Sequence, residues 1–250
     1  AALRASAERA LDQLVAGCSQ NDACRDAHPD LVGEIELVEQ RYDAKPIVMD
    51  VALDDTTPAE TFVITGADAI AAVAQAMYDA ALIPLLPRLI GSLSTGDAAI
   101  IPELIRQNVA FHHSIAWGTN LSVDCADYSR LTGAADGAAI ADPGRFRTLL
   151  TETTCEQWPV EATSDTFNTP VTSDVPALVL AGQYDPITPP AGGERVASRL
   201  SNSTFALWPN RGHGITGDAC AEDLMADFLE HPERPLNLDC LAAISGPAFV

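Results

Sequence analysis

The apolar positions of the chain repeat with one spacing in its first two thirds and with another in its last third. Near the N-terminus they recur every three or four residues, which is the spacing of a helix with one buried face. The residues that show this spacing are Leu11, Leu14, Val15 and Cys18. A second helix is predicted for residues 28–42, "HPDLVGEIELVEQRY", where a proline stands near the start and apolar residues share one face.

Two short apolar runs in this first part have the composition of strands. Residues 46–53, "PIVMDVAL", and residues 60–66, "ETFVITG", flank a polar segment that contains a proline. This arrangement predicts a hairpin or a similar excursion. The remaining segments predict a helix over 67–82, a proline-interrupted helix over 84–93, a helix over 96–118 with Asp97 as its N-cap, a short strand over 120–127, a loop over 132–142 and a helix over 144–158.

From about Asp174 the pattern changes. The segment "VPALVLAG" is a continuous apolar run, which is typical of a parallel strand buried on both faces. It is followed by a helix pattern, "GGERVASRL", a second strand, "STFALW", a turn, "PNRGHG", and a closing helix, "DACAEDLMADFLEH". A strand–helix–strand–helix order indicates the α/β class. We therefore divide the chain into a mainly helical region, residues 1–173, and an α/β region, residues 174–250.

Composition limits the kinds of partner that the protein can have. The chain has 250 residues, of which 47% are hydrophobic, and this suits a globular protein with one or two domains. Its formal net charge is −21 and Lys45 is its single lysine, so no binding to nucleic acid through phosphate neutralisation is expected. No apolar run reaches the roughly 18 residues of a membrane span. The acidity indicates a solvated surface, or alternatively a field that attracts cationic groups of a substrate.

Six cysteines are spread along the chain. They form no C-x-x-C pair and no Cys/His set with zinc-finger spacing, so we expect neither a metal nor another cofactor. Six cysteines allow 15 disulfide connectivities, of which the simplest pairs sequential neighbours: Cys18 with Cys24, Cys125 with Cys155, and Cys220 with Cys240. The alternative is six free thiols. We favour complete pairing, which implies an oxidising compartment, extracellular or periplasmic.

The two predicted strands of the α/β region each lead to a side chain with catalytic potential. Asp185 lies four residues after Ala181, and His213 lies five residues after Trp208. Adjacent parallel strands place such groups at one edge of the sheet. There, a carboxylate that accepts a hydrogen bond from a histidine ring orients that ring and stabilises its protonated form. The alternatives are that Asp185 only caps an Asp-Pro turn and that His213 is an ordinary loop residue.

The same segment carries a family resemblance. Residues 176–214, "PALVLAGQYDPITPPAGGERVASRLSNSTFALWPNRGHG", contain the motif GxxDPxTP followed by GHG. They resemble the C-terminal part of α/β-hydrolases of the tripeptidyl-aminopeptidase-like family. Upstream segments around the first four cysteines, and residues 77–97, are similar to the helical cap of that family. The resemblance implies a partial α/β-hydrolase fold with the last parallel strands and a mainly helical cap. It also implies Asp185 as the acid and His213 as the base of a Ser-Asp-His triad.

The nucleophile that this family needs is not recognisable in the sequence. A triad serine would stand in G-x-S-x-G between a strand and a helix. In the nearest segment, residues 91–96, the glycines do not have the spacing of this motif, and Ser94 is predicted to be a residue at the end of a helix. In the family the serine and the oxyanion loop precede the cap. We therefore expect the chain to correspond to the C-terminal portion of a longer hydrolase, to need the N-terminal portion as its partner, and to be inactive alone.

The function implied by the resemblance is that of a secreted serine hydrolase, an exopeptidase that releases amino acids or short peptides from free N-termini. One alternative is an esterase or lipase that acts on a small ester with the same triad. Another is a non-catalytic binding module derived from a hydrolase. Candidate substrate-binding residues are Tyr184, beside the acid, and Asp127 and Glu156, which neighbour Cys125 and Cys155 and suit a substrate amine. The plainer interpretation of these two carboxylates is that they are surface acids.

Overall fold

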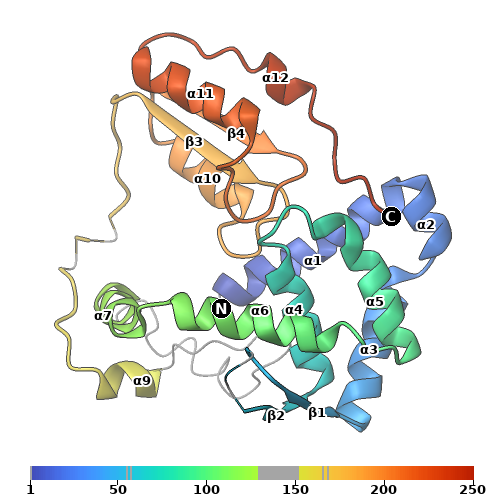
Figure 1. Cartoon of the computed structure of the whole chain (residues 1–250). Helices are drawn as coiled ribbons and strands as arrows, with labels where there is room; N and C mark the ends of the chain where they lie inside the picture. The colour runs from blue at the N-terminus through green and yellow to red at the C-terminus, as the bar shows by residue number, and fades with distance from the viewer. Residues whose placement is uncertain (1, 55, 57, 129–151, 165, 168) are drawn as a thin grey trace. The chain divides into compact units, whose positions relative to one another are not determined.

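The computed structural model describes residues 2–54, 56, 58–128, 152–164, 166–167 and 169–250 (Figure 1). The chain forms two compact units, and each collects segments that are distant in the sequence. The first unit consists of Ala1–Arg4, Val38–Ala72 and Ala98–Thr169, and the second of Ala5–Leu37, Val73–Asp97 and Pro170–Val250. The units therefore cut across the division at residues 173 and 174 that the sequence pattern suggests.

Helices fill the N-terminal part of the chain. Two of them, α1 (Ala2–Gln20) and α3 (Leu31–Ala44), lie where the sequence predicts helices. Between them lies a short helix that was not predicted, α2 (Asp22–Ala27). The apolar face predicted for the first helix is buried, with Leu14 fully inaccessible and Cys18 1% exposed. Asn21 begins α2, because its side chain accepts a hydrogen bond from the Cys24 backbone N–H at 3.0 Å.

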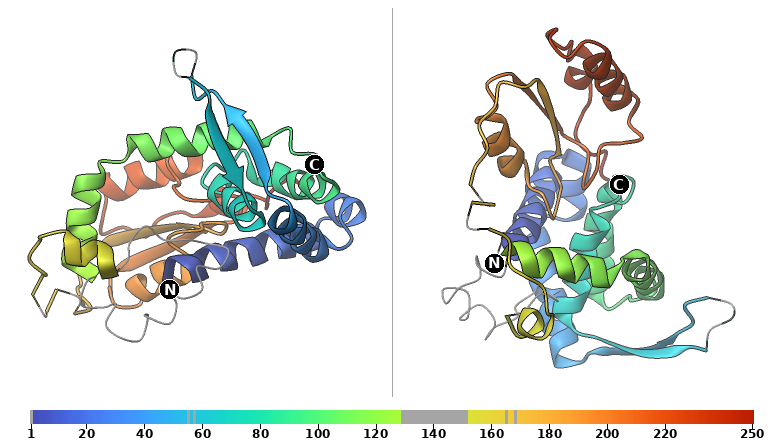
Figure 2. Two further views of the ribbon diagram at one scale, coloured as in Figure 1. Left: turned by 90° about the horizontal axis from the view of Figure 1, so that it is seen from below. Right: turned by 90° about the vertical axis from the view of Figure 1, so that its left-hand side faces the viewer.

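The predicted hairpin lies in the first unit. Strands β1 (Ile47–Val51) and β2 (Glu60–Ile64) pair antiparallel, with Met49 opposite Phe62. Figure 2 shows the two strands side by side. The helices that follow along the chain are α4 (Gly66–Ala76), η1 (Ile83–Leu85), α5 (Leu86–Thr95), α6 (Ile101–Ser114), α7 (Trp117–Tyr128) and α9 (Glu152–Gln157).

Two predictions for the middle of the chain are wrong. The strand predicted for residues 120–127 lies inside α7, where Cys125 faces inward and Val123 outward, as helical spacing allows. The helix predicted over 96–118 is two helices, and Asp97 does not cap the first, since α6 begins at Ile101. Gly96 ends α5 in a left-handed conformation, so the Asp97 backbone N–H donates to the Ser92 carbonyl instead.

Other predicted boundaries shift or cannot be compared. Helix α4 ends at Ala76, six residues before the predicted end. The loop predicted over 132–142 and the first part of the helix predicted over 144–158 lie outside the described residues, and α9 covers Glu152–Gln157 of that helix.

The last third has the predicted strand–helix–strand–helix order. Its elements are β3 (Ala177–Gly182), α10 (Pro190–Ala197), β4 (Ser203–Trp208), α11 (Ala219–Glu230) and α12 (Asp239–Ala242). The strands are parallel and in register from the Ala177–Ser203 pair to the Gly182–Trp208 pair.

The two faces of this small sheet are covered differently. Val179 and Phe205, which are register partners, lie against Gly193 of α10. Ala206 and Trp208 face the other side, where they form a core with Leu224 of α11. Burial of β3 on both faces is nevertheless incomplete, because its first four residues are only half-buried by the part of the chain that is described.

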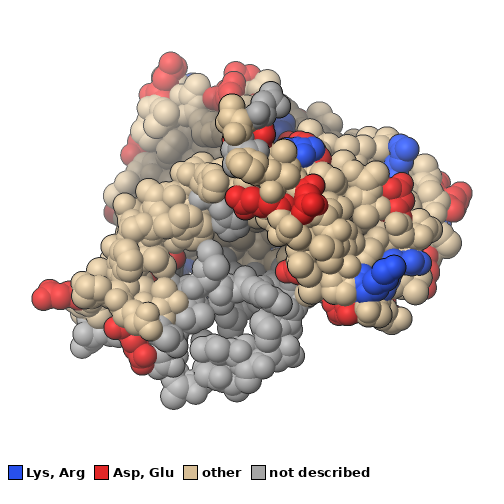
Figure 3. Space-filling view, turned by 60° about the horizontal axis from the view of Figure 1, so that its bottom comes forward, with Lys and Arg blue, Asp and Glu red and all other residues tan. Residues whose placement is uncertain are grey.

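Three disulfides connect neighbouring helices, in the sequential pairing that the sequence favours. Cys18–Cys24 joins α1 to α2, Cys125–Cys155 joins α7 to α9, and Cys220–Cys240 joins α11 to α12. Carboxylates are spread over the face seen in Figure 3, with some basic side chains among them, in keeping with the net charge of −21. Of the helices that the structure describes, none has the length and apolar character needed to cross a membrane.

Two helical glycines should respond in opposite directions to the same substitution. A Cβ at Gly17 would run into the Tyr184 hydroxyl and would lie 3.2 Å from the Phe249 ring, whereas a Cβ at Gly192 would meet nothing closer than 4.0 Å. We expect Gly17→Ala to lower the free energy of unfolding by about 1–3 kcal/mol. Gly192→Ala should raise it by up to about 1 kcal/mol through helix propensity. Urea denaturation of both variants measures this, and a stabilised Gly17→Ala would contradict the packing.

Candidate active site

The loops that leave β3 and β4 are joined by their backbones. Immediately after β3, the N–H of Gln183 donates to the Trp208 carbonyl at 2.9 Å, and the N–H of Tyr184 donates to the Arg211 carbonyl at 2.9 Å. These bonds continue the contact between the parallel strands past Gly182 and hold two otherwise irregular segments at one edge of the sheet. That edge carries both residues predicted to form a catalytic pair.

The carboxylate of Asp185 is almost completely buried, with 3% of the residue exposed. Its Oδ1 accepts hydrogen bonds from the backbone N–H groups of Ile187 and Thr188, both at 2.8 Å. Its Oδ2 accepts one from the Thr188 hydroxyl at 2.7 Å and lies 3.0 Å from Nδ1 of His213. Asp185 therefore caps the Asp-Pro turn and contacts His213 at the same time, so the two alternatives posed by the sequence are not exclusive.

His213 presents its ring between the carboxylate and solvent. Its side chain is 38% exposed, and the next residue, Gly214, has a φ of 97°, which favours glycine. With the Asp185 carboxylate as acceptor, the ring carries a proton on Nδ1 and donates it. The other nitrogen, Nε2, is then the one that can accept a proton from an incoming group.

A residue that the sequence analysis missed, Tyr78, packs on the histidine. The ring centroids of Tyr78 and His213 are 4.8 Å apart with a tilt of 53°. Gly212 permits this approach, because a Cβ at that position would run into the Met77 carbonyl. Burial, and secondly the charge of Asp185, raise the pKa of Tyr78 to about 12. No sequence signal marks Tyr78, since it precedes His213 by more than 130 residues.

Thr188 was also missed, although a signal for it exists. It is the threonine of the DPxTP motif, and its hydroxyl donates to Asp185 Oδ2 and lies 3.3 Å from His213 Nδ1. A hydroxyl three residues after an aspartate that caps a turn is close enough to donate to the carboxylate. The residue therefore fixes the rotamer of the acid.

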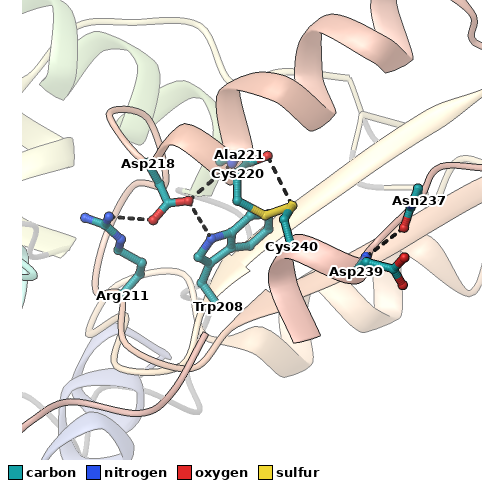
Figure 4. The surroundings of a disulfide bond; sticks show 8 residues. All are labelled: Trp208, Arg211, Asp218, Cys220, Ala221, Asn237, Asp239 and Cys240. Carbon is teal, nitrogen blue, oxygen red and sulfur yellow. Dashed lines mark hydrogen bonds and ion pairs between the residues drawn. A yellow bond between two sulfur atoms is a disulfide. The ribbon is translucent and has the colours of Figure 1, made fainter. Parts of the chain in front are cut away.

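A second aspartate, the half-buried Asp218, lies at the end of the loop of residues 209–218 that carries His213, here called the histidine loop (Figure 4). Asp218 caps α11 by accepting from the Ala221 N–H, and it also accepts from Arg211 Nη2 at 2.6 Å and Trp208 Nε1 at 3.3 Å. Burial alone would raise the pKa of Asp218, but the bonds from Arg211, Trp208 and Ala221 outweigh it and lower this pKa. The Cys220–Cys240 disulfide lies directly after this cap.

Tyr184 does not face His213. It is 2% exposed and its hydroxyl lies at Gly17 of α1. Burial raises the pKa of Tyr184, while a hydrogen bond with Gln13 acts in the opposite direction. The residue therefore belongs to the packing between α1 and the loop of residues 183–189 that carries Asp185, here called the acid loop.

The two candidate amine-binding carboxylates lie in the first unit. Asp127 lines an open groove of about 780 Å³ whose apolar walls include Val123, Trp158 and Phe167. Glu156 is exposed and is not among the residues that line this groove. Among the described residues, no three side chains of the metal-binding types come together.

One comparison with known proteins bears on this site. Residues 144–240 match the family model described as TAP-like protein, an α/β-hydrolase family, and the match includes both Asp185 and His213. No curated protein matches the chain. Together with the strand–helix–strand–helix order, the match supports a hydrolase of the α/β class that is similar to TAP-like proteins.

Replacing Asp218 should destabilise the protein in a pH-dependent manner. Its pKa is lowered in the folded state, so its stabilisation is present above the unfolded-state pKa of about 3.9 and is lost as the pH falls through the folded-state pKa. We expect Asp218→Asn to lower the free energy of unfolding by about 1–3 kcal/mol at neutral pH, with a smaller difference below about pH 4. Asp223→Asn, at an exposed position of the same helix, is the control. Equal effects of both substitutions in urea titrations would contradict this account.

The phenol of Tyr78 should report the charge of Asp185. With a pKa of about 12, Tyr78 stays mostly neutral at about pH 11, so Tyr78→Phe should remove little phenolate absorbance there. In an Asp185→Asn background the pKa should fall but stay above its ordinary value, because burial is the larger cause. Tyr78→Phe should then remove more absorbance. If Tyr78→Phe removes the same absorbance in both backgrounds, the charge of Asp185 does not affect the pKa of Tyr78, and this prediction is wrong.

Proposed function

We propose that Asp185 and His213 are the acid and base of a serine-hydrolase triad whose serine lies outside these 250 residues. The observation that carries the proposal is the 3.0 Å contact of a buried carboxylate with a histidine at the carboxyl edge of a parallel sheet. The TAP-like match over the same residues supports it. The absence of a G-x-S-x-G motif from the sequence is the reason for assigning the serine to another segment.

The chemistry follows from the two nitrogens of His213. Nε2 takes the proton from the serine hydroxyl as its oxygen attacks the substrate carbonyl carbon, and the resulting imidazolium is stabilised by Asp185. His213 then returns this proton to the leaving amine or alcohol as the scissile bond breaks. Water repeats the sequence on the acyl-enzyme and restores the serine. Because two backbone N–H groups occupy Oδ1 of Asp185, the other oxygen stays directed at Nδ1.

For the substrate, we favour peptides with a free N-terminus, from which the hydrolase releases amino acids or short peptides. The support is the TAP-like match and the groove in which Asp127 stands beside apolar walls, which suits an amine next to an apolar side chain. Glu156 is a second candidate for the amine. An esterase or lipase is the alternative within the same chemistry. Aminoacyl and tripeptidyl anilides, assayed against p-nitrophenyl esters, separate the two, and turnover of esters alone would exclude the peptidase.

The proposed partner is the N-terminal portion of the same hydrolase. In the part of the chain that is described, the sheet of β3 and β4 has two strands, so each strand has an edge without a strand partner. Such edges accept further strands. In this proposal residues 174–250 contribute the catalytic pair and residues 1–173 form the mainly helical cap. The three disulfides support an extracellular or periplasmic location.

A fluorophosphonate probe tests the missing serine. We expect no labelling of the 250-residue chain and labelling once the separately expressed N-terminal portion is added. His213→Ala should then abolish turnover, and Asp185→Asn should reduce it about 10⁴-fold. His231→Ala, at an exposed position after α11, should leave it unchanged.

Stoichiometric labelling of the isolated chain would place the nucleophile within it and overturn the proposal. A second candidate function, a binding module that has lost catalysis, is favoured by the absent motif. It would be supported if the N-terminal portion docks but no serine is labelled in the complex.

A further inference from the structure

Arg9, on helix α1, reaches the loop that carries Asp185. Its guanidinium donates from Nη1 to the carbonyl of Gln183 at 2.9 Å and from Nη2 to the carbonyl of Asp185 at 2.7 Å. These partners are 174 and 176 residues away in the sequence, and all three residues belong to the second unit. The two terminal nitrogens of one guanidinium therefore donate hydrogen bonds to two carbonyls of the same short turn, at residues 183 and 185.

Placing a charged guanidinium here costs free energy, because the group loses part of its contact with water. Burial lowers the pKa of Arg9, while the charges of Asp185 and Asp12 act in the opposite direction. Its Nε is buried without a hydrogen-bond partner among the residues that the structure describes. An apolar side chain of similar length would fill this space without that desolvation. The two carbonyl bonds are therefore the specific gain that the guanidinium brings to the turn.

The carbonyls that Arg9 binds complete the hydrogen bonding of the turn. The N–H of Gln183 donates to the carbonyl of the last residue of β4, and the N–H of Tyr184 donates to a carbonyl of the histidine loop. The N–H of Asp185 donates to the Gly182 carbonyl. Arg9 takes the carbonyls of residues 183 and 185, so the peptide groups around the acid are held through both their N–H and their C=O groups. Held in this way, the Cα of Asp185 has little freedom to move its carboxylate relative to His213.

We propose that Arg9 is a positioning residue for the Asp185–His213 pair: it fixes the backbone of the acid loop so that the carboxylate stays within hydrogen-bond distance of Nδ1. A lysine cannot replace it fully, because one ammonium does not offer two parallel donors in a fixed plane. The consequence for catalysis rests on the proposed function, but the geometric role does not. Supports of this kind matter because catalytic groups must be held within about 0.5 Å.

The tautomer of the His213 ring tests the proposal in the isolated chain. At about pH 8, where an ordinary histidine is neutral, the ¹⁵N shifts of its ring distinguish Nδ1–H from Nε2–H. A resonance absent from His213→Gln identifies the residue among the five histidines. We expect mainly Nδ1–H in the wild type, a clear loss of Nδ1–H in Arg9→Met, and an intermediate population in Arg9→Lys.

Arg25→Met is the matched control, because Arg25 is 48% exposed on α2 and pairs with Asp22 at the surface. The tautomer of His213 in this variant should be the same as in the wild type. A wild-type tautomer in Arg9→Met with native circular dichroism would overturn the proposal. If Arg9→Met does not fold, Arg9→Lys decides: loss of Nδ1–H supports the role, and a wild-type tautomer overturns it.

Activity provides a second measurement. In the hydrolase reconstituted with its N-terminal portion, Arg9→Met should lower kcat on the order of 10²-fold, as a small misplacement of a catalytic group does, and leave KM unchanged. A rise in KM with unchanged kcat would overturn the role. If the tautomer shifts as expected but no variant or wild type ever turns over substrate, the proposed function fails and the positioning role stands.

Discussion

The parallel pairing of β3 with β4 sets the geometry of the candidate active site. The strands are in register over six residue pairs and end together at Gly182 and Trp208. Asp185 and His213 therefore leave the same edge a few residues later, and their loops are joined by backbone hydrogen bonds. A slip of one residue would turn every side chain of a strand to the opposite face and separate the two groups. The hydrogen bond between Asp185 and His213 is thus a consequence of strand register.

Burying a carboxylate costs free energy unless its oxygens are bonded. Asp185 meets this requirement with donors from its own turn, from Thr188 and from His213. Asp218 meets it at the other end of the histidine loop with donors from Arg211 and Trp208. The two aspartates hold the loops on either side of His213, so the residues that stabilise this edge and those suited to chemistry are partly the same.

The second unit unites segments that the sequence separates. Helix α1 contributes Arg9 and Gly17 to the acid loop, and the turn after α4 contributes Tyr78 to the histidine. A division of the chain by pattern alone assigns these residues to a helical region and the Asp185–His213 pair to an α/β region. In the structure, both sets share one unit, so the mainly helical segments supply part of the surroundings of the pair.

The sequence by itself determined the strand–helix–strand–helix order after Asp174 and singled out the two side chains, Asp185 and His213, that meet at the sheet edge. It could do so because strand periodicity, the DPxTP turn and short strand-to-loop distances are local features. It did not determine that residues 120–127 are helical, because a short segment of mixed apolar and polar residues suits either state until its neighbours bury one face. Nor did it determine that Tyr184 turns towards α1 or that Arg9 and Tyr78 belong to the site. Those contacts join residues more than 130 positions apart, and only tertiary packing decides which distant side chains meet.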